Sequence, residues 1–149
     1  MIKTQNPLEK MASPALSFYG LGIAPKIMEI IAQLKFTNAT PIQHKAIPIA
    51  LEGKDFIGIA QTGTGKTMAF AIPTVQNLAK GQSSALILVP TRELALQVEE
   101  SISKIARSFA MKSVVLIGGA PIHAQIRSLK QQPRILIATP GRLIDLMQQ

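Results

Sequence analysis

Short apolar runs alternate with longer amphipathic stretches along most of this chain of 149 residues. Four runs have the length and aliphatic content of strands buried on both faces, at residues 55–60, 84–90, 113–119 and 134–140. Helical periodicity occurs between them and also before the first run, over residues 23–36. This alternation predicts an α/β fold with a mostly parallel sheet and helices on both faces.

The clearest helical pattern covers residues 91–110. Its apolar side chains recur at intervals of three and four residues, which places them on one face of a helix. They are Leu94, Val98, Ile102, Ile105 and Phe109. We therefore expect one long helix with a single buried stripe between the second and third strands.

Composition limits the class of protein. Hydrophobic residues make up 47% of the chain and charged residues 16%, which is typical of one globular domain with a sizeable core. No run approaches the roughly eighteen apolar residues of a membrane span, and the polar start lacks the apolar segment of a signal peptide. We expect a flexible tail at residues 1–16, a folded domain at residues 17–149 and no membrane partner.

Charge and cysteine content point to partner and compartment. Lys and Arg number 16 against 8 Asp and Glu, so an anionic partner such as nucleic acid is favoured. A solvated basic surface would explain the charge equally well. The chain has no cysteine, which excludes disulfides and thiolate metal sites and suits a reducing, cytoplasmic location.

The loop AQTGTGKT, at residues 60–67, has the composition of a phosphate-binding loop. A strand, a glycine-containing loop and Gly-Lys-Thr at a helix start place successive backbone N–H groups around phosphate oxygens. Lys66 would reach the β and γ phosphates, and the Thr67 hydroxyl would hold Mg²⁺. The strict pattern has glycine where this chain has Ala60. An ordinary turn with a surface lysine is the alternative, and the flanking strand and helix favour the phosphate loop.

The loops after the other strands also suit an anion. Ligands of parallel sheets bind beyond the carboxyl ends of the strands, and here PTREL, GGAPIHAQ and TPGRL follow the second, third and fourth runs. PTREL and TPGRL each place a capping threonine and an arginine at a helix N-terminus, where the helix dipole, free amides and guanidinium converge. The alternative is that Arg92 and Arg142 pair with neighbouring carboxylates, Glu93 and Asp145.

TPIQ, at residues 40–43, predicts the start of another helix. Thr40 as N-cap, Pro41 at the first helical position and Gln43 at the third form a capping box. In that arrangement, Gln43 satisfies a backbone amide.

Five strings in order and at matching spacing resemble the first domain of DEAD-box RNA helicases, from about Phe18 to the C-terminus. They are KFTNATPIQ, AQTGTGKT, PTRELA, the pair Gly118 and Gly119, and TPGR. Alanine at position 60 is usual in that family. The resemblance implies an incomplete RecA-like P-loop NTPase domain, with ATP and Mg²⁺ as cofactors and RNA as partner.

The resemblance also implies roles for single residues. Lys66 and Thr67 would serve catalysis, and Gln43 would read the adenine edge and so select ATP over GTP. Phe36 would pack on the base, with Phe18 as the upstream aromatic of the same motif, although both could equally be core residues. The nucleotide-binding residues would be Phe18, Phe36, Gln43, Ala60, Gln61, Thr62, Gly63, Thr64, Gly65, Lys66 and Thr67. The RNA backbone would be held by Thr91, Arg92, Gly118, Gly119, Thr139, Gly141 and Arg142, with little base specificity.

In that family, a carboxylate for Mg²⁺ and a residue that orients water lie in an Asp-Glu-Ala-Asp string, which does not occur in this chain. We expect this chain to be the ATP-binding and RNA-backbone-binding portion of an ATP-dependent RNA helicase, which remodels or unwinds RNA duplexes in its full-length form. The chain itself would be inactive in hydrolysis. A missing strand would leave an unpaired sheet edge through which two copies could dimerise. A non-enzymatic binding module with a vestigial loop is the other class that stays open.

Overall fold

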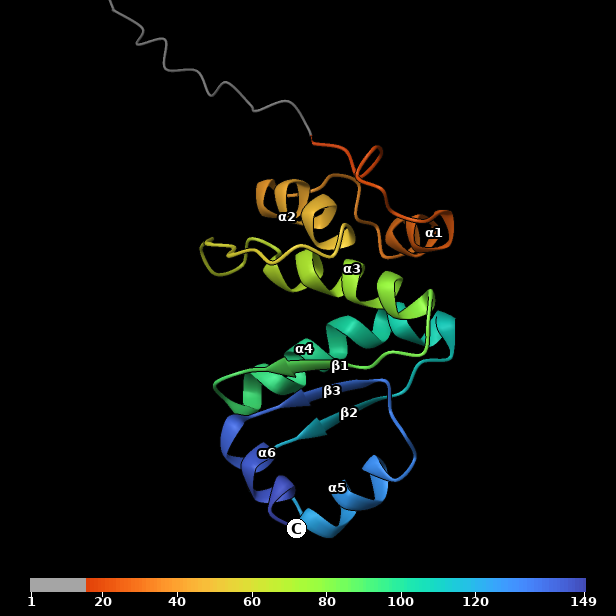
Figure 1. Cartoon of the computed structure of the whole chain (residues 1–149). Helices are drawn as coiled ribbons and strands as arrows, with labels where there is room; N and C mark the ends of the chain where they lie inside the picture. Colours follow the sequence, from red (N-terminus) through yellow and green to blue (C-terminus); the bar gives the residue numbers. More distant parts are fainter. Residues whose placement is uncertain (1–15) are drawn as a thin grey trace, which may run out of the picture.

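The computed structural model describes residues 16–149, in which helices cover both faces of a parallel sheet (Figure 1). The strands are β1 (Ala85–Leu88), β2 (Ser113–Leu116) and β3 (Ile135–Ala138), in the order β1-β3-β2. Ala85 and Ser113 both lie opposite Ile135. The helices are α1 (Pro25–Gln33), α2 (Pro41–Leu51), α3 (Lys66–Ala79), α4 (Arg92–Ala106), the short 3-10 helix η1 (Arg107–Phe109), α5 (Ile122–Leu129) and α6 (Pro140–Met147). The predicted α/β class is confirmed.

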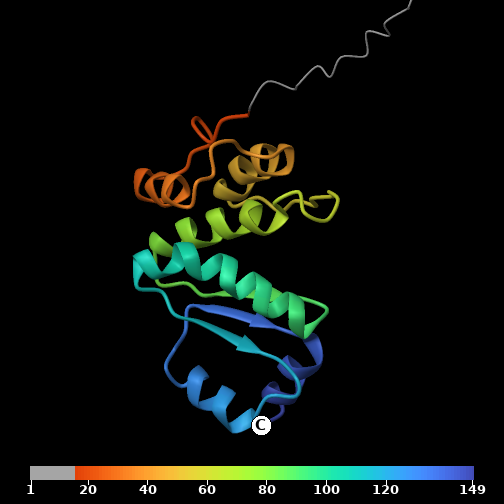
Figure 2. The same ribbon diagram turned by 180° about the vertical axis from the view of Figure 1, so that it is seen from behind.

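The sheet separates two apolar cores, because successive side chains of a strand point to opposite faces. Ile135 and Ile137 are fully buried in the main core, on the face that α4 covers. Leu116 and Ala138 belong to a smaller core with apolar side chains of α5 and α6. In Figure 2, α3 lies beyond α4, and α1 and α2 lie beyond α3. The helices α4 and α6 follow β1 and β3. Because these two strands are parallel, both helices start at the same edge of the sheet.

The predicted periodicity of residues 91–110 is confirmed by α4 and η1. Val98, Ile102 and Ile105 are buried in the main core, and Leu94 and Phe109 pack against it. The segment ends at Ala110, whose φ of 53° takes the backbone into the left-handed region. One amphipathic helix with one buried face thus connects β1 to β2.

Residues 55–60, which the sequence predicts to be a strand buried on both faces, do not join the sheet. The segment is irregular, and Ile57 and Ile59 are each 92% exposed. A strand is held by hydrogen bonds and side-chain contacts with its neighbours, and this segment pairs with no strand of the described sheet. An apolar cleft of about 350 Å³, lined by residues such as Phe56 and Leu88, lies between it and β1.

Arg134 forms hydrogen bonds with the segment that connects α3 to β1. Its guanidinium donates to the carbonyl oxygens of Leu78 and Gly81, both at 2.7 Å, and to Ser83 at 2.8 Å and 3.0 Å. These carbonyls lie at the end of α3 and in the loop that follows, and the Leu78 carbonyl also accepts from the amide of Gly81 at 3.2 Å, so one side chain ties the helix end to its loop. The contact fixes where β1 starts beside β3.

The N-terminal end of the described region is tied to the body of the protein. Leu16 packs against the main core, and its carbonyl accepts a hydrogen bond from Ala39 at 2.7 Å. Leu16 therefore belongs to the folded part, although the predicted tail included it. The rest of the predicted tail, residues 1–15, lies outside the described residues. Within residues 16–149, no helix is long and apolar enough to cross a membrane.

Candidate functional site

The glycine-containing loop before α3 forms even though the segment before it is not a strand. Gly63 and Gly65 have φ of +77° and +84°, which favour glycine because a Cβ would be strained there. The Thr64 hydroxyl donates to the carbonyl of Gln61 at 2.6 Å. The backbone of this loop is thus held in the turned form that a phosphate cradle requires.

Lys66 is the first residue of α3, and its side chain folds back across the loop. Its ammonium group donates to the carbonyl oxygen of Ala60, at the other end of the same loop. The positive charge therefore lies at the helix N-terminus, where the helix dipole also favours an anion. Thr67, the other residue with a predicted catalytic role, is half-buried beside it.

Gln43 connects α2 to this loop. Its side chain is buried, its Oε1 accepts from the backbone amide of Thr40 at 2.9 Å, and its Nε2 donates to the carbonyl of Gly65 at 3.1 Å. A Cβ on Gly65 would collide with Gln43 Nε2. The predicted bond to a backbone amide is confirmed. The predicted capping box is also confirmed, with the Thr40 side chain facing the Gln43 backbone, although the Thr40 hydroxyl has no close hydrogen-bond partner among the described residues.

A cleft of about 540 Å³ lies at this loop. Seven of the residues predicted to bind nucleotide line it: Phe36, Gln43, Thr62, Gly63, Gly65, Lys66 and Thr67. Ala60, Gln61 and Thr64 shape the loop without lining the cleft. Phe18 is only 4% exposed and belongs to the main core, which agrees with the alternative that it is a core residue.

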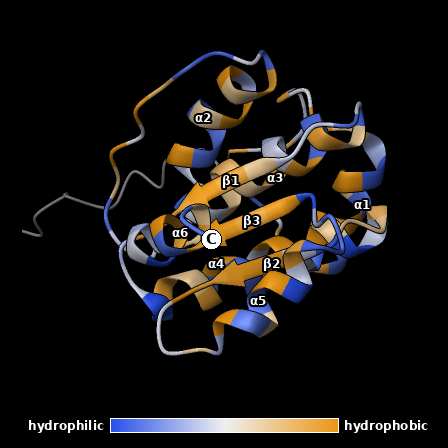
Figure 3. Ribbon diagram, turned by 60° about the horizontal axis from the view of Figure 1, so that its bottom comes forward, coloured by the Kyte–Doolittle hydropathy of each residue, from blue (hydrophilic) through white to orange (hydrophobic). Residues whose placement is uncertain are grey.

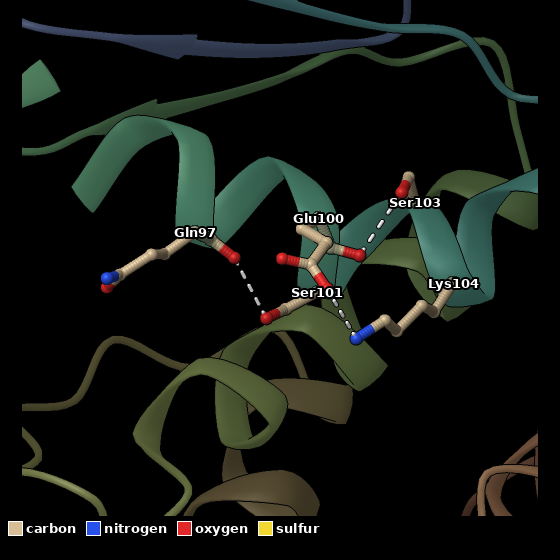
Figure 4. Close-up of polar contacts among 5 residues, drawn as sticks. All are labelled: Gln97, Glu100, Ser101, Ser103 and Lys104. Carbon is tan, nitrogen blue, oxygen red and sulfur yellow. Dashed lines mark hydrogen bonds and ion pairs between the residues drawn. The ribbon is translucent and has the colours of Figure 1, made fainter. Parts of the chain in front are cut away.

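Two polar residues of α4 line the same cleft, and sequence reasoning missed them. Gln97 and Ser101 lie one turn apart, and the Ser101 hydroxyl donates to the Gln97 carbonyl at 2.9 Å (Figure 4). Further along the helix, Lys104 pairs with Glu100 at 3.0 Å. Gln97 and Ser101 could have been found from the sequence by their spacing of four residues on the polar side of the helix that follows PTREL.

A second cleft, of about 520 Å³, lies where the three strands end. Its lining combines the start of α4, the turn after β2 and the start of α6. Six of the seven residues predicted to hold RNA are among its lining residues: Thr91, Arg92, Gly118, Thr139, Gly141 and Arg142. The structure therefore brings together residues from three separate loops, as the ends of parallel strands should. We call this space the arginine cleft.

Arg92 lies against the glycine turn that follows β2. A Cβ on Gly118 would be 3.3 Å from Arg92 Nη2, and a Cβ on Gly119, at φ +80°, would overlap Nη1. The two glycines are thus needed for the close approach of the guanidinium group. Among the described residues, Arg92 forms no ion pair, so the alternative that it is neutralised by Glu93 is wrong for this structure.

Arg142 reaches the same turn from α6. Its Nη1 donates to the carbonyl of Ala120 at 3.0 Å, and its side chain is only 11% exposed. Its Nε is 3.7 Å from the Asp145 carboxylate and has no hydrogen-bond partner among the described residues. The alternative pairing with Asp145 is therefore present as a long ion pair. An anion in the cleft would complement a guanidinium that the protein satisfies only in part.

The two threonines that precede these arginines differ. Thr91 caps α4, because its side chain accepts from the amide of Leu94 at 3.2 Å. Thr139 is the N-cap residue of α6, as predicted, but its side chain makes no capping hydrogen bond. Pro140 at the first helical position carries no N–H, and the Thr139 hydroxyl does not use the later ones. The first turn of α6 consequently keeps donors for an anion.

No group of three or more His, Cys, Asp or Glu residues in residues 16–149 could hold a metal ion. The oxygen of Thr67 is the one predicted protein ligand for Mg²⁺, and a metal there would depend on the oxygens of a bound nucleotide.

Comparison with known proteins agrees with this geometry. The model of the DEAD/DEAH box helicase family matches residues 40–149. The chain is 51% identical over 131 residues to the ATP-dependent rRNA helicase RRP3 of Debaryomyces hansenii, and 46% identical over 130 residues to the ATP-dependent RNA helicase CshA of Listeria monocytogenes. The matched regions are 87% and 86% of this chain but only 28% and 25% of those two proteins.

Solved structures give the same result. The crystal structure of the RNA helicase Prp28 from Chaetomium thermophilum bound to ADP matches with a TM-score of 0.82 at 36% identity, over 89% of this chain and 34% of that one. A hypothetical ATP-dependent RNA helicase from Sulfolobus tokodaii matches with a TM-score of 0.76 at 41% identity, over 83% of this chain and 36% of that one. The chain thus spans about a third of these structures.

Proposed function

This chain belongs to the DEAD/DEAH box helicase family and has its RecA-like fold, and from that premise we propose that it binds ATP and the RNA backbone as part of an ATP-dependent RNA helicase. One observation carries the proposal. The two clefts meet at the first turn of α4, where Leu94 lines the cleft at the glycine loop and Arg92 lines the arginine cleft. A nucleotide and an RNA phosphate would therefore contact neighbouring residues of one helix.

The glycine loop suits a nucleotide triphosphate. Its turned backbone, the Lys66 ammonium and the start of α3 all favour phosphate at one place. Gln43 uses one lone pair and one N–H within the protein, which leaves one of each for the adenine edge. Thr67 would hold Mg²⁺ together with the nucleotide phosphates, and this ion would neutralise charge on them.

The arginine cleft suits an RNA backbone. Its donors are guanidinium groups, turn amides and a helix start, all of which bind phosphate oxygens. We therefore expect binding with little sequence specificity. Duplex remodelling belongs to the longer protein, and we expect this chain alone not to hydrolyse ATP. A cytoplasmic location is proposed on the absence of cysteine.

Calorimetric titration with Mg-ADP, with Mg-GDP run in parallel, tests the nucleotide part. We expect ADP to bind and GDP to bind at least about tenfold more weakly, because the Gln43 carboxamide mismatches the guanine O6 edge. Equal binding of both would remove the predicted role of Gln43. Binding of neither, under conditions in which the chain is folded, would contradict the assignment of the loop.

We also propose that two copies of this chain associate through the free edge of β1. Leu86 and Leu88 are 52% and 54% exposed there, and the neighbouring Ile57 and Ile59 are 92% exposed. In Figure 3, β1 lies at this edge of the sheet and is drawn in hydrophobic colours over most of its length. An uncovered edge strand with apolar side chains is a template for pairing with another chain.

Light scattering over a range of concentrations tests this association. We expect a concentration-dependent dimer, which Leu88→Lys should shift to monomer because a charged side chain blocks edge pairing. Ile144→Lys is the matched control, since Ile144 is also 54% exposed but lies on α6. A monomer at every concentration, or equal effects of both substitutions, would contradict the proposal.

A further inference from the structure

Gln125, on α5, is a buried polar residue that belongs to none of the sites described above. It is only 6% exposed, and its Nε2 donates to the carbonyl oxygen of Ile117 at 2.9 Å. Its Oε1 is also buried and has no hydrogen-bond partner among the described residues. A buried acceptor without a partner destabilises the fold, so stability alone would favour an apolar side chain of similar size here.

The partner of Gln125 explains why a carboxamide is useful at this position. Ile117 lies between the last residue of β2 and the glycine pair that contacts Arg92. At the other end of the same turn, the Ala120 carbonyl accepts from Arg142. Side chains from α5 and α6 therefore hold both ends of a four-residue turn, and the guanidinium of Arg92 lies against its middle.

The glycine turn has little else to hold it in place. Among the described residues, the backbone amides of Gly118 and Gly119 donate no hydrogen bond. Their position relative to Arg92 depends on how the ends of the turn are fixed, because glycine allows many backbone conformations. Free amides held next to a guanidinium group are the donors that a phosphate oxygen would use.

We propose that Gln125 is a positioning residue for RNA binding: through the Ile117 carbonyl, it holds the glycine turn at the place where its amides and Arg92 converge on a phosphate. This inference rests on the proposed RNA-binding function. Gln125 itself is buried and contacts no ligand. It acts on the geometry of the cleft and adds no charge to it.

Gln125→Met separates this role from a structural one, because methionine has similar length and no hydrogen-bonding amide. We expect a melting temperature close to that of the unsubstituted chain, unchanged Mg-ADP affinity and about tenfold weaker binding of a short fluorescent oligouridylate, since misplaced contact groups lose most of their effect. The amide NMR signals of Gly118 and Gly119 should shift without RNA present. Should Gln125→Met unfold, Gln125→Asn, which keeps the amide but is too short to reach Ile117, should show the same loss.

Ser128→Ala is the matched control on the same helix, because the Ser128 hydroxyl donates only to the Ala124 carbonyl within α5, at 3.1 Å. It should leave RNA affinity and the glycine signals unchanged. Wild-type RNA affinity in the Gln125 variants would overturn this inference and leave the proposed function standing. Absence of RNA binding by the unsubstituted chain would instead overturn the proposed function, and this inference with it.

Discussion

Lys66→Ala is expected to abolish nucleotide binding by this chain while leaving its fold intact. The Lys66 ammonium lies at the start of α3 and contacts only the loop carbonyl of Ala60 among its described hydrogen-bond partners. Its removal takes away the charge that would pair with phosphate, and losing one partner of such a contact weakens binding by about a hundredfold or more. Calorimetry with Mg-ADP measures the effect.

Lys54→Ala is the matched control for this experiment. Lys54 is an exposed lysine in the same region, and it pairs with Glu52 outside the cleft. Its substitution should leave ADP affinity unchanged. If Lys66→Ala binds ADP as well as the unsubstituted chain does, the loop is vestigial and the competing class, a non-enzymatic binding module, gains support.

Arg92→Gln and Arg142→Gln are each expected to weaken RNA binding to a similar extent for all sequences. Both guanidinium groups line the arginine cleft, and a contact to phosphate carries no base information. Each substitution should also lower the slope of log affinity against log salt by about one, because one fewer phosphate is neutralised. Fluorescence anisotropy with two oligonucleotides of different sequence, measured at several salt concentrations, tests both expectations.

Arg107→Gln controls for general charge, because Arg107 is exposed on η1, at the end of α4 that is remote from the arginine cleft. It should change RNA affinity much less than the cleft variants. An equal loss for all three would show that RNA binds the basic surface in general. The melting temperature of Arg142→Gln should also be recorded, since Arg142 holds the Ala120 carbonyl.

Much of the fold could be predicted because its determinants are local. Three of the four expected strands form, as does the long helix with its buried stripe at Val98, Ile102 and Ile105. Short apolar runs and helical periodicity are properties of neighbouring residues, and they can be recognised in the sequence, although β1 is not buried on both faces as predicted, because Leu86 and Leu88 are exposed. The same holds for the Thr91 cap and for the bond between Gln43 and Thr40, whose partners lie three residues apart.

The failed strand prediction has a physical cause, which is that the deciding partner lies outside the segment. Residues 55–60 have the composition of a strand, but a strand is held by pairing with a neighbour, and this segment pairs with no strand of the described sheet. For Phe18 the sequence left a base-stacking role and a core role open, and its ring packs in the main core. Thr139 has the right position for a cap, yet its hydroxyl makes no capping bond.

The sequence by itself determined the family, the order of the elements and which loops carry glycine, threonine and arginine, because these depend on residue identity and short spacing. Only the tertiary structure decided how those loops meet. Gln43 bonds to the Gly65 carbonyl, and Arg92 lies against the glycine turn. Gln125 and Arg142 bond to the two ends of that turn. Several of these contacts join segments more than twenty residues apart. Their geometry follows from the order in which parallel strands assemble, which brings the strand ends to one edge of the sheet.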